Sequence, residues 1–350
     1  MVPARHPPLA PEHLDRPHLR SSLGHLQLES GEVIMDYEQS YVTHGRLDGQ
    51  RPRVALLLPA IGATHHRLDF LIGPGRAFDP QHWFIVVADP IGNGLSTSPS
   101  NSRAQPWGAF PRFTIRDMVA AQHRLITEVL GIQRLAAVAG ASMGGMQALQ
   151  WAVSHADLVE SVVALTPLAR SPAWTIAGNA AARAALMADP AWDGQRFRAV
   201  PERGLRAWSA IQHVLLNRTP RGLAADFPEA AGVLAWMDTL AAKAVRHGPD
   251  AHDCIYQSWA YDAHDLGTTP GFGGDTAAAL AAIRARTLLL TPPLDLYNPV
   301  EEAEIAARCI AGARHVVIPS EQGHQAANVA QQADVRFVNE AIRSFLEAGV

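Results

Sequence analysis

The chain contains two kinds of hydrophobic pattern that predict β-strands. Between residues 26 and 42, apolar and polar positions alternate around Ser30 and Gly31, as in an antiparallel hairpin with one face in water. Later runs are short and almost entirely apolar, which is typical of parallel strands buried on both faces. These runs span residues 54–58, 83–87, 135–139, 159–165, 287–290 and 315–318.

Helical patterns lie between several of the buried strands. Apolar residues recur with helical spacing over residues 115–130, 146–153, 300–310 and 335–346. Strands and helices that alternate in this way predict a mostly parallel α/β sheet with helices on both faces. We expect the first hairpin to form an antiparallel edge of that sheet.

The alternation stops between residues 169 and 280. This stretch is rich in Ala and Trp, has a helical period and contains no convincing buried strand, so it predicts a helical insertion. Its Ala and Leu stripes indicate core or a dimer face rather than a cofactor site. An insertion over the carboxyl ends of the strands would form a lid. The predicted organisation is a loose tail over residues 1–20, a catalytic core of residues 21–168 and 281–350, and the lid.

Composition and charge remove several classes of function. With 29 Lys plus Arg against 33 Asp plus Glu, and without a basic run, the chain lacks the footprint of a nucleic-acid-binding protein. Two cysteines are too few for a disulfide framework. The first twenty residues lack the apolar core of a secretory signal, and no apolar run approaches the roughly 18 residues that span a bilayer. We therefore expect a cytoplasmic protein without a membrane partner.

One motif carries candidate chemistry. Gly140-Ala141-Ser142-Met143-Gly144 joins a buried strand to a helical pattern and has the form G-x-S-x-G, where a nucleophile elbow exposes its serine. Glycines leave room for the tight turn, and the helix N-terminus supplies N–H groups and a positive dipole end. The motif predicts Ser142 as a nucleophile.

A serine hydroxyl is a weak nucleophile at neutral pH, so it needs a general base and an acid that orients the base. Downstream, in the order that this kind of elbow requires, Asp295 follows one buried strand and His324 follows the next. Both residues lie just past the carboxyl ends of their strands, where a doubly wound sheet gathers its site. The sequence predicts a Ser142, Asp295, His324 triad and a covalent acyl-enzyme.

The loop after residues 54–58 is the second candidate element of the site. The backbone N–H groups of Met143 and Ile61 are the expected oxyanion donors. His65 and His66 could suggest a metal site, but adjacent side chains point in different directions and the surrounding sequence offers no third ligand at a typical spacing. We expect no metal here, and a role for both histidines in the pocket wall or the oxyanion loop.

Several segments resemble one known family, the homoserine O-acetyltransferases of the α/β-hydrolase fold. The similarity runs from about residue 26 to the C-terminus and includes the lid. It implies the same triad, acyl transfer in two half-reactions, and a homodimer built through lid helices. The segments are GASMGGMQALQWA, LIGPGRAFDP, FTIRDMVAAQ, ADPAWDGQRF and DAHDLG.

The chain departs from this family at positions that the resemblance assigns to the acceptor. Family members carry an aspartate after the catalytic histidine, where this chain has Gln325, and a lid arginine that an ungapped comparison places at Ser209. The loop that usually reads L-T-G-D-S is here Ile61 to His65. A zwitterionic amino acid needs buried opposite charges to bind it, so homoserine is a poor substrate candidate.

These observations leave three functions. The missing charges and the loop DPIGNGLSTSPSN favour a hydrolase of a small carboxylic ester or thioester, with water as the acceptor. The alternative is an O-acyltransferase that moves an acyl group from acyl-CoA to a small hydroxyl compound. A catalytically silent binding protein on the same fold is the third, and the intact triad argues against it. No cofactor is expected, and acyl-CoA enters only as a co-substrate of the transferase.

Overall fold

A computed structural model describes residues 9–47, 53–328 and 331–348. Its central feature is an eight-stranded sheet with the strand order β1-β2-β4-β3-β5-β6-β7-β8. β1 pairs antiparallel with β2, β2 pairs antiparallel with β4, and all further pairings are parallel. The strands are β1 (Leu19–Gln27), β2 (Val33–His44), β3 (Val54–Leu58), β4 (Phe84–Ala88), β5 (Ala137–Ala141), β6 (Ser161–Leu165), β7 (Arg286–Thr291) and β8 (Arg314–Val317).

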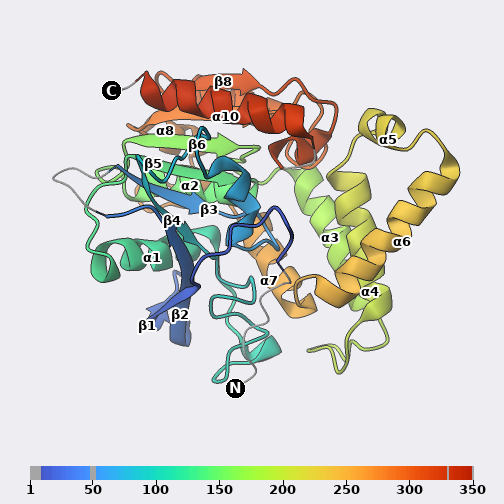
Figure 1. Cartoon of the computed structure of the whole chain (residues 1–350). Helices are drawn as coiled ribbons and strands as arrows, with labels where there is room; N and C mark the ends of the chain where they lie inside the picture. The colour runs from blue at the N-terminus through green and yellow to red at the C-terminus, as the bar shows by residue number, and fades with distance from the viewer. Residues whose placement is uncertain (1–8, 48–52, 329–330, 349–350) are drawn as a thin grey trace.

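Helices cover both faces of the sheet and fill the insertion between β6 and β7 (Figure 1). Short 3-10 segments include η1 (His65–Leu71) and η6 (Gly323–Ala327), and α1 continues as a π-helical turn, η3 (Leu125–Val129). The α-helices are α1 (Ile115–Arg124), α2 (Met143–Ser154), α3 (Ala173–Met187), α4 (Glu202–Ala210), α5 (Pro220–Asp226), α6 (Ala230–His247), α7 (Ala251–Asp262), α8 (Thr276–Ala281), α9 (Val300–Cys309) and α10 (Gln332–Glu347).

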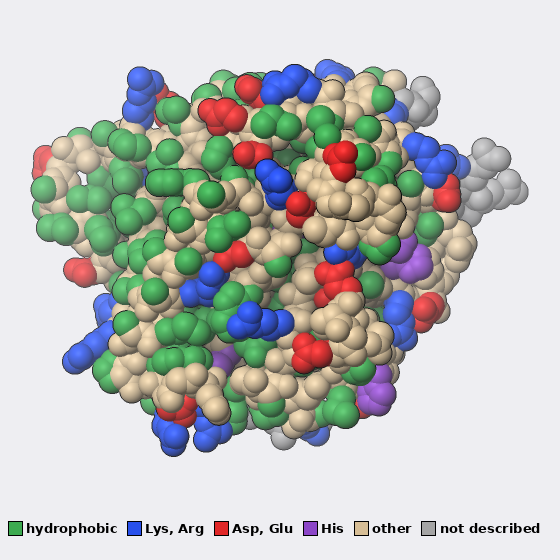
Figure 2. Space-filling model, turned by 180° about the vertical axis from the view of Figure 1, so that it is seen from behind, with side chains coloured by type: hydrophobic (Ala, Val, Ile, Leu, Met, Phe, Trp, Pro, Cys, Tyr) green, Lys and Arg blue, Asp and Glu red, His purple; other side chains and the backbone are tan. Residues whose placement is uncertain are grey.

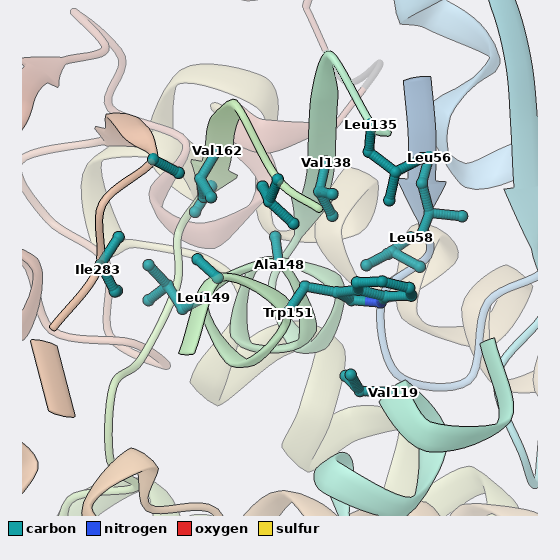
Figure 3. Packing of buried hydrophobic residues seen from close by; sticks show 14 of the residues in the cluster. Leu56, Leu58, Val119, Leu135, Val138, Ala148, Leu149, Trp151, Val162 and Ile283 are labelled. Carbon is teal, nitrogen blue, oxygen red and sulfur yellow. The ribbon is translucent and has the colours of Figure 1, made fainter. Parts of the chain in front are cut away.

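The apolar strands are buried on both faces because successive side chains point to opposite sides of the sheet. Leu56 and Val138 belong to the core that includes α2, whereas Leu57 and Ala139 belong to the core that includes α10. Figure 3 shows Trp151 of α2 between the strand side chains and α1. The predicted mostly parallel sheet with helices on both faces is confirmed.

The N-terminal boundary differs from the prediction. β1 begins at Leu19, inside the segment of residues 1–20 for which the sequence predicts a loose tail. Part of the segment before it also packs: the Leu14 N–H donates to Asp69 at 2.8 Å, and the His13 ring stacks on His66 at 4.2 Å. The tail boundary is therefore too late, because these residues contact η1. Residues 1–8 lie outside the described part of the chain.

The insertion gathers at the carboxyl ends of the parallel strands, where Figure 1 shows α3 to α7 beside the arrowheads. Its last helix, α8, differs: Ala279 and Leu280 are buried in the same core as α2 and β5. The lid predicted over residues 169–280 thus ends with a helix that packs into the core. No helix within the described ranges is long and apolar enough to cross a membrane. The cytoplasmic location stays a prediction.

The strand order creates one topological switch point. β3 and β5 are neighbours, but the chain leaves β3 for β4 on one side and returns to β5 on the other. Sheets of this kind place their sites outside the carboxyl ends of the strands at such a switch point. The loop after β3 and the turn after β5 are the two elements predicted to hold an oxyanion.

Candidate active site

The turn between β5 and α2 has the geometry of a nucleophile elbow. Ser142 has φ 57° and ψ −120°, a strained conformation for a residue with a side chain. The surrounding glycines are required by space: a Cβ on Gly144 would lie 1.8 Å from the Leu58 carbonyl oxygen, and one on Gly140 would lie 2.1 Å from the Gly144 carbonyl oxygen. The Ser142 N–H donates to Leu165 of β6 at 2.8 Å, which fixes the turn to the sheet.

The second part of the site is a buried carboxylate and histidine pair. His324 Nδ1 lies 2.7 Å from Asp295 Oδ2, and the Asp295 side chain is fully buried. The other carboxylate oxygen accepts the backbone N–H groups of Tyr297 and Asn298, both at 2.9 Å. These bonds fix the carboxylate after β7 and leave Nε2 of His324 as the ring nitrogen that faces away from Asp295. The structure thus pairs two residues of the predicted triad.

Ser142 is hydrogen-bonded to a lid residue. Its Oγ lies 3.5 Å from Oη of Tyr261, at the end of α7, and the described residues include no hydrogen bond from Ser142 to His324. Tyr261 is fully buried and donates to Asn298 Oδ1 at 2.7 Å. Catalytic hydrogen bonds often form only when substrate binds, so this resting contact is compatible with a triad. A chain of hydrogen bonds through Tyr261 and Asn298 links Ser142 to Asp295 and so to His324.

The loop after β3 starts against the elbow, because the Leu58 and Pro59 carbonyl oxygens closely approach Gly144. Ala63 N–H donates to the Ala60 carbonyl at 3.2 Å, and Gly62 has φ 65°, so residues 60–63 form a turn with Ile61 at its second position. α7 holds this turn, because Gln257 accepts the Gly62 N–H at 2.7 Å and donates to Ile91 at 2.9 Å. Met143 occupies the first turn of α2, where N–H groups lack intrahelical partners. Both expected donors lie just past the carboxyl ends of β3 and β5, and their role at an oxyanion stays a prediction.

The paired histidines lie in a different cluster. His65 contacts Asp89 at the end of β4 through both its N–H, at 2.8 Å, and Nδ1, at 3.0 Å. His66 Nδ1 lies 2.7 Å from Asp69. Their rings therefore face buried carboxylates behind the loop that carries Ile61. The cluster anchors that loop, and a direct role of the two rings in binding substrate stays a prediction.

The tertiary structure brings two further potential metal ligands, His18 and Asp89, close to His65. Nitrogen atoms of His18 and His65 and an oxygen of Asp89 lie within 4.8 Å of one another, the one such group of three among the described residues. Ser40 Oγ also donates to Asp89, at 2.6 Å, and contacts His18. Burial would raise the pKa of Asp89, but hydrogen bonds from His18 and His65 outweigh it and hold that pKa well below its usual range. A hydrogen-bonded carboxylate accounts for this group without a metal ion.

The two positions that depart from the resemblance lie outside the triad contacts. Ser209 is buried and borders a cavity of about 220 Å³ between α4 and α6, which is lined by none of the triad residues. Gln325 accepts a hydrogen bond from Asn328 Nδ2 at 3.1 Å within its own loop. Their predicted contacts with an acceptor stay predictions.

Sequence reasoning missed the polar residues that α7 and the Asp295 loop bring to the site. Asp253, Gln257 and Tyr261 are spaced four residues apart, which places them on one face of α7. That polar stripe within an otherwise buried helix was the available signal. Tyr297 was missed too: its ring lies 5.1 Å from the His324 ring and stacks on Tyr261 at 5.3 Å.

Comparisons with known proteins agree with this geometry. The family model described as the alpha/beta hydrolase fold matches residues 56–237. A homoserine O-acetyltransferase from Nostoc punctiforme is 32% identical over 340 residues, covering 91% of this chain and 92% of that protein. A homoserine O-succinyltransferase from Leptothrix cholodnii is 32% identical over 338 residues, covering 86% and 89%.

A solved structure extends the comparison to hydrolases. An acetylester hydrolase from Corynebacterium glutamicum is 27% identical, with a TM-score of 0.87 over 95% of this chain and 96% of that one. The relatives are thus enzymes of acyl transfer and of ester hydrolysis, and this chain is an enzyme of one of these two kinds. By sequence and by structure, the chain belongs to the α/β-hydrolase fold and, within it, to the homoserine O-acetyltransferase family.

Proposed function

We propose that the protein hydrolyses small carboxylic esters or thioesters through an acyl-enzyme on Ser142. The observation that carries this proposal is the Asp295–His324 pair, 2.7 Å apart, at the same edge of the sheet as the strained Ser142. A side chain forced out of the sheet, a buried base and an acid that orients it are the parts that nucleophilic acyl transfer needs.

Each of these residues has one role in the proposed reaction. Ser142 Oγ attacks the acyl carbon while His324 Nε2 takes its proton, and the Met143 and Ile61 N–H groups stabilise the oxyanion. The bond to the leaving oxygen breaks as His324 returns the proton to it. Water then attacks the acyl-enzyme, with His324 again as base. Asp295 holds the imidazole orientation and stabilises its charged form.

A small movement of Ser142 begins this sequence. In the resting structure its Oγ contacts Tyr261. Rotation about χ1, between staggered positions, turns the hydroxyl toward a new partner at little cost. We expect bound substrate to shift Ser142 from Tyr261 to His324.

Charge near the site favours water over an amino-acid acceptor. The lid polar network runs from Tyr297 through Asn179 to Asp262, whose carboxylate pairs with Arg183 at 2.6 Å. These two half-buried charges neutralise each other. A zwitterion would need its own opposite charges in this pocket, because burying an unpaired charge costs several kcal/mol. The acetylester hydrolase similarity supports the same choice.

The second candidate is an O-acyltransferase with acyl-CoA as co-substrate. It is favoured by the two acyltransferase relatives, each 32% identical over most of the chain. In this version a hydroxyl compound replaces water in the second step, and the first step is unchanged. The two candidates therefore differ only in what deacylates Ser142.

Labelling and product analysis test the proposal. A fluorophosphonate should label the wild type but not Ser142→Ala, and p-nitrophenyl acetate should give a burst of p-nitrophenol. Absence of labelling in both proteins would refute the acyl-enzyme. Acetate as the main product, with or without homoserine, supports hydrolysis. Efficient formation of O-acetylhomoserine from acetyl-CoA would instead support the transferase.

We also propose a homodimer built through the lid. α6 has 18 residues and buries none of them, and Leu234 on it is 62% exposed. Figure 2 shows many apolar and few charged side chains on the lid side, at the left of that view. An apolar helix face without a cover in one chain is typical of a surface that a partner buries.

A further inference from the structure

The direction of each hydrogen bond around Tyr261 can be assigned. Asn298 Nδ2 donates to the Thr166 carbonyl at 2.6 Å, which fixes the orientation of the amide because a carbonyl oxygen only accepts. Asn298 Oδ1 is therefore the atom that faces Tyr261, at 2.7 Å. An amide oxygen cannot donate, so the single hydroxyl proton of Tyr261 lies on this bond.

The consequence is that Tyr261 presents lone pairs to Ser142. With its proton committed to Asn298, Tyr261 Oη accepts a hydrogen bond from Ser142 Oγ across 3.5 Å in the resting state. Burial raises the pKa of Tyr261 well above its usual range, so the hydroxyl keeps its proton throughout the working pH range. The reacting atoms thus face a fixed, neutral hydrogen-bond acceptor.

We propose that Tyr261 determines the acyl acceptor, because its lone pairs can be satisfied by water but not by an alcohol. This inference rests on the proposed acyl-enzyme at Ser142. A water molecule that attacks the acyl carbon has two O–H bonds: one donates to His324 and the other donates to Tyr261. An alcohol has a single O–H group, and that group must donate to His324. The buried acceptor at Tyr261 would then be left without a hydrogen-bond partner. Unmade hydrogen bonds in buried sites discriminate strongly between substrates.

The deacylation step balances with the groups named. The water oxygen forms a bond to the acyl carbon, and its first proton goes to His324 Nε2. The tetrahedral intermediate then breaks its bond to Ser142 Oγ, which takes that proton back from His324. The second proton stays with the product acid. Tyr261 gains and loses no proton.

Partition of a common intermediate tests the proposal. The enzyme is acetylated with p-nitrophenyl acetate in a fixed concentration of methanol, and methyl acetate and acetate are quantified. Both products arise from one acyl-enzyme, so their ratio does not depend on the acylation rate or on the fraction of active protein. In Tyr261→Phe the ratio of methyl acetate to acetate should rise about 5- to 30-fold, the value of one hydrogen bond to the reacting water.

Tyr297 provides a matched control. It stacks on Tyr261, but its hydroxyl donates to Asn179 at 2.7 Å. Tyr297→Phe removes a neighbouring buried hydroxyl and should leave the product ratio within about twofold of wild type, a change well below one hydrogen bond. Tyr261→Leu, which also lacks the hydroxyl, should repeat the shift seen in Tyr261→Phe and covers the case in which the phenylalanine variant folds poorly.

The outcomes separate this inference from the function on which it rests. An unchanged or lowered ratio in Tyr261→Phe, or an equal shift in Tyr297→Phe, overturns the role of Tyr261 while the acyl-enzyme stands. A wild type that acetylates alcohols in preference to water overturns it as well. If fluorophosphonate does not label Ser142 and no burst occurs, the proposed function itself fails.

Discussion

α6 and α7 are consecutive helices of one insertion, yet they differ completely in their contacts. α7 buries ten of its 12 residues, whereas α6 buries none of its 18. Only three residues, 248–250, separate the two helices. The difference shows that the lid is not a single cover over a finished site. α7 belongs to the site, and α6 belongs to the surface.

The polar stripe on α7 explains why this helix is fixed. Asp253 accepts two hydrogen bonds from Ser100, Gln257 holds the turn that contains Ile61, and Tyr261 contacts Ser142. One helix face therefore touches three separate loops at the carboxyl ends of the strands. Because buried polar groups must be paired, α7 can pack against the core only in this register.

The largest expected effect is the loss of kcat when the proposed nucleophile, Ser142, is replaced. Ser142→Ala should lower kcat by at least about 10⁴-fold, because removal of a triad nucleophile leaves only the binding and oxyanion contributions. Leu234→Ala on α6 should change kcat less than twofold, as expected of a surface substitution. Initial rates with p-nitrophenyl acetate measure both. Comparable losses in the two variants would contradict the division between α6 and α7.

Acid should lower the free energy of unfolding through His264, which follows α7. His264, two residues after α7, is buried and donates to the Leu168 carbonyl at 3.2 Å. Burial lowers its pKa to about 4. Above pH 6.5 neither the folded nor the unfolded chain protonates this residue. Between about pH 6.5 and 4 only the unfolded chain does, so its contribution to the free energy of unfolding falls as pH falls, by up to about 3 kcal/mol.

His264→Gln isolates this contribution, because an amide can keep the bond to Leu168 but does not titrate. Urea unfolding at pH 7 and pH 5 should show a smaller loss of stability in His264→Gln than in wild type, by about 1 to 2 kcal/mol. The matched variant on α6 is His247→Gln, since His247 is exposed. Equal pH dependence of wild type and His264→Gln would refute the assignment.

A moderate effect should follow from loosening the oxyanion turn. Gln257→Leu removes the acceptor of the Gly62 N–H and the donor to Ile91. We expect kcat to fall about 10- to 100-fold, because a misplaced donor costs part of the stabilisation of the oxyanion. Thr239→Val on α6 removes a hydroxyl whose one hydrogen bond within the described part of the chain goes to the Ala235 carbonyl of its own helix, and should leave kcat unchanged. A wild-type kcat in Gln257→Leu would contradict the assignment of α7 to the active site.

The smallest change in folding stability is expected on α6. Leu234→Lys places a charge where the side chain is already exposed, so monomer stability should change by less than about 0.5 kcal/mol. The same charge would oppose burial against a partner. Sedimentation velocity should therefore show a dimer for the wild type and a monomer for Leu234→Lys. A wild-type monomer would contradict the proposed dimer and leave α6 as a free surface.

Much of the site could be predicted because its signals are local. The elbow around Ser142 needs glycines at fixed offsets, and Asp295 and His324 each follow a short buried strand. Ile61 follows the same rule after β3. By contrast, the boundary of the N-terminal tail was wrong because His13 and Leu14 are anchored by η1, more than fifty residues away. No local pattern marks such an anchor.

Hydrophobic period and turn chemistry act within a few residues, so local patterns are enough to predict the parallel sheet, the elbow at Ser142 and a triad in the order Ser142, Asp295, His324. The distant side chains that contact these elements are selected by tertiary packing. Tyr261 reaches Ser142 across 119 residues, and His18 joins Asp89 from the start of the chain. Such contacts depend on which face of α7 packs inward and on how the N-terminal segment lies over η1. These arrangements are set by the burial and pairing of polar groups across the whole fold.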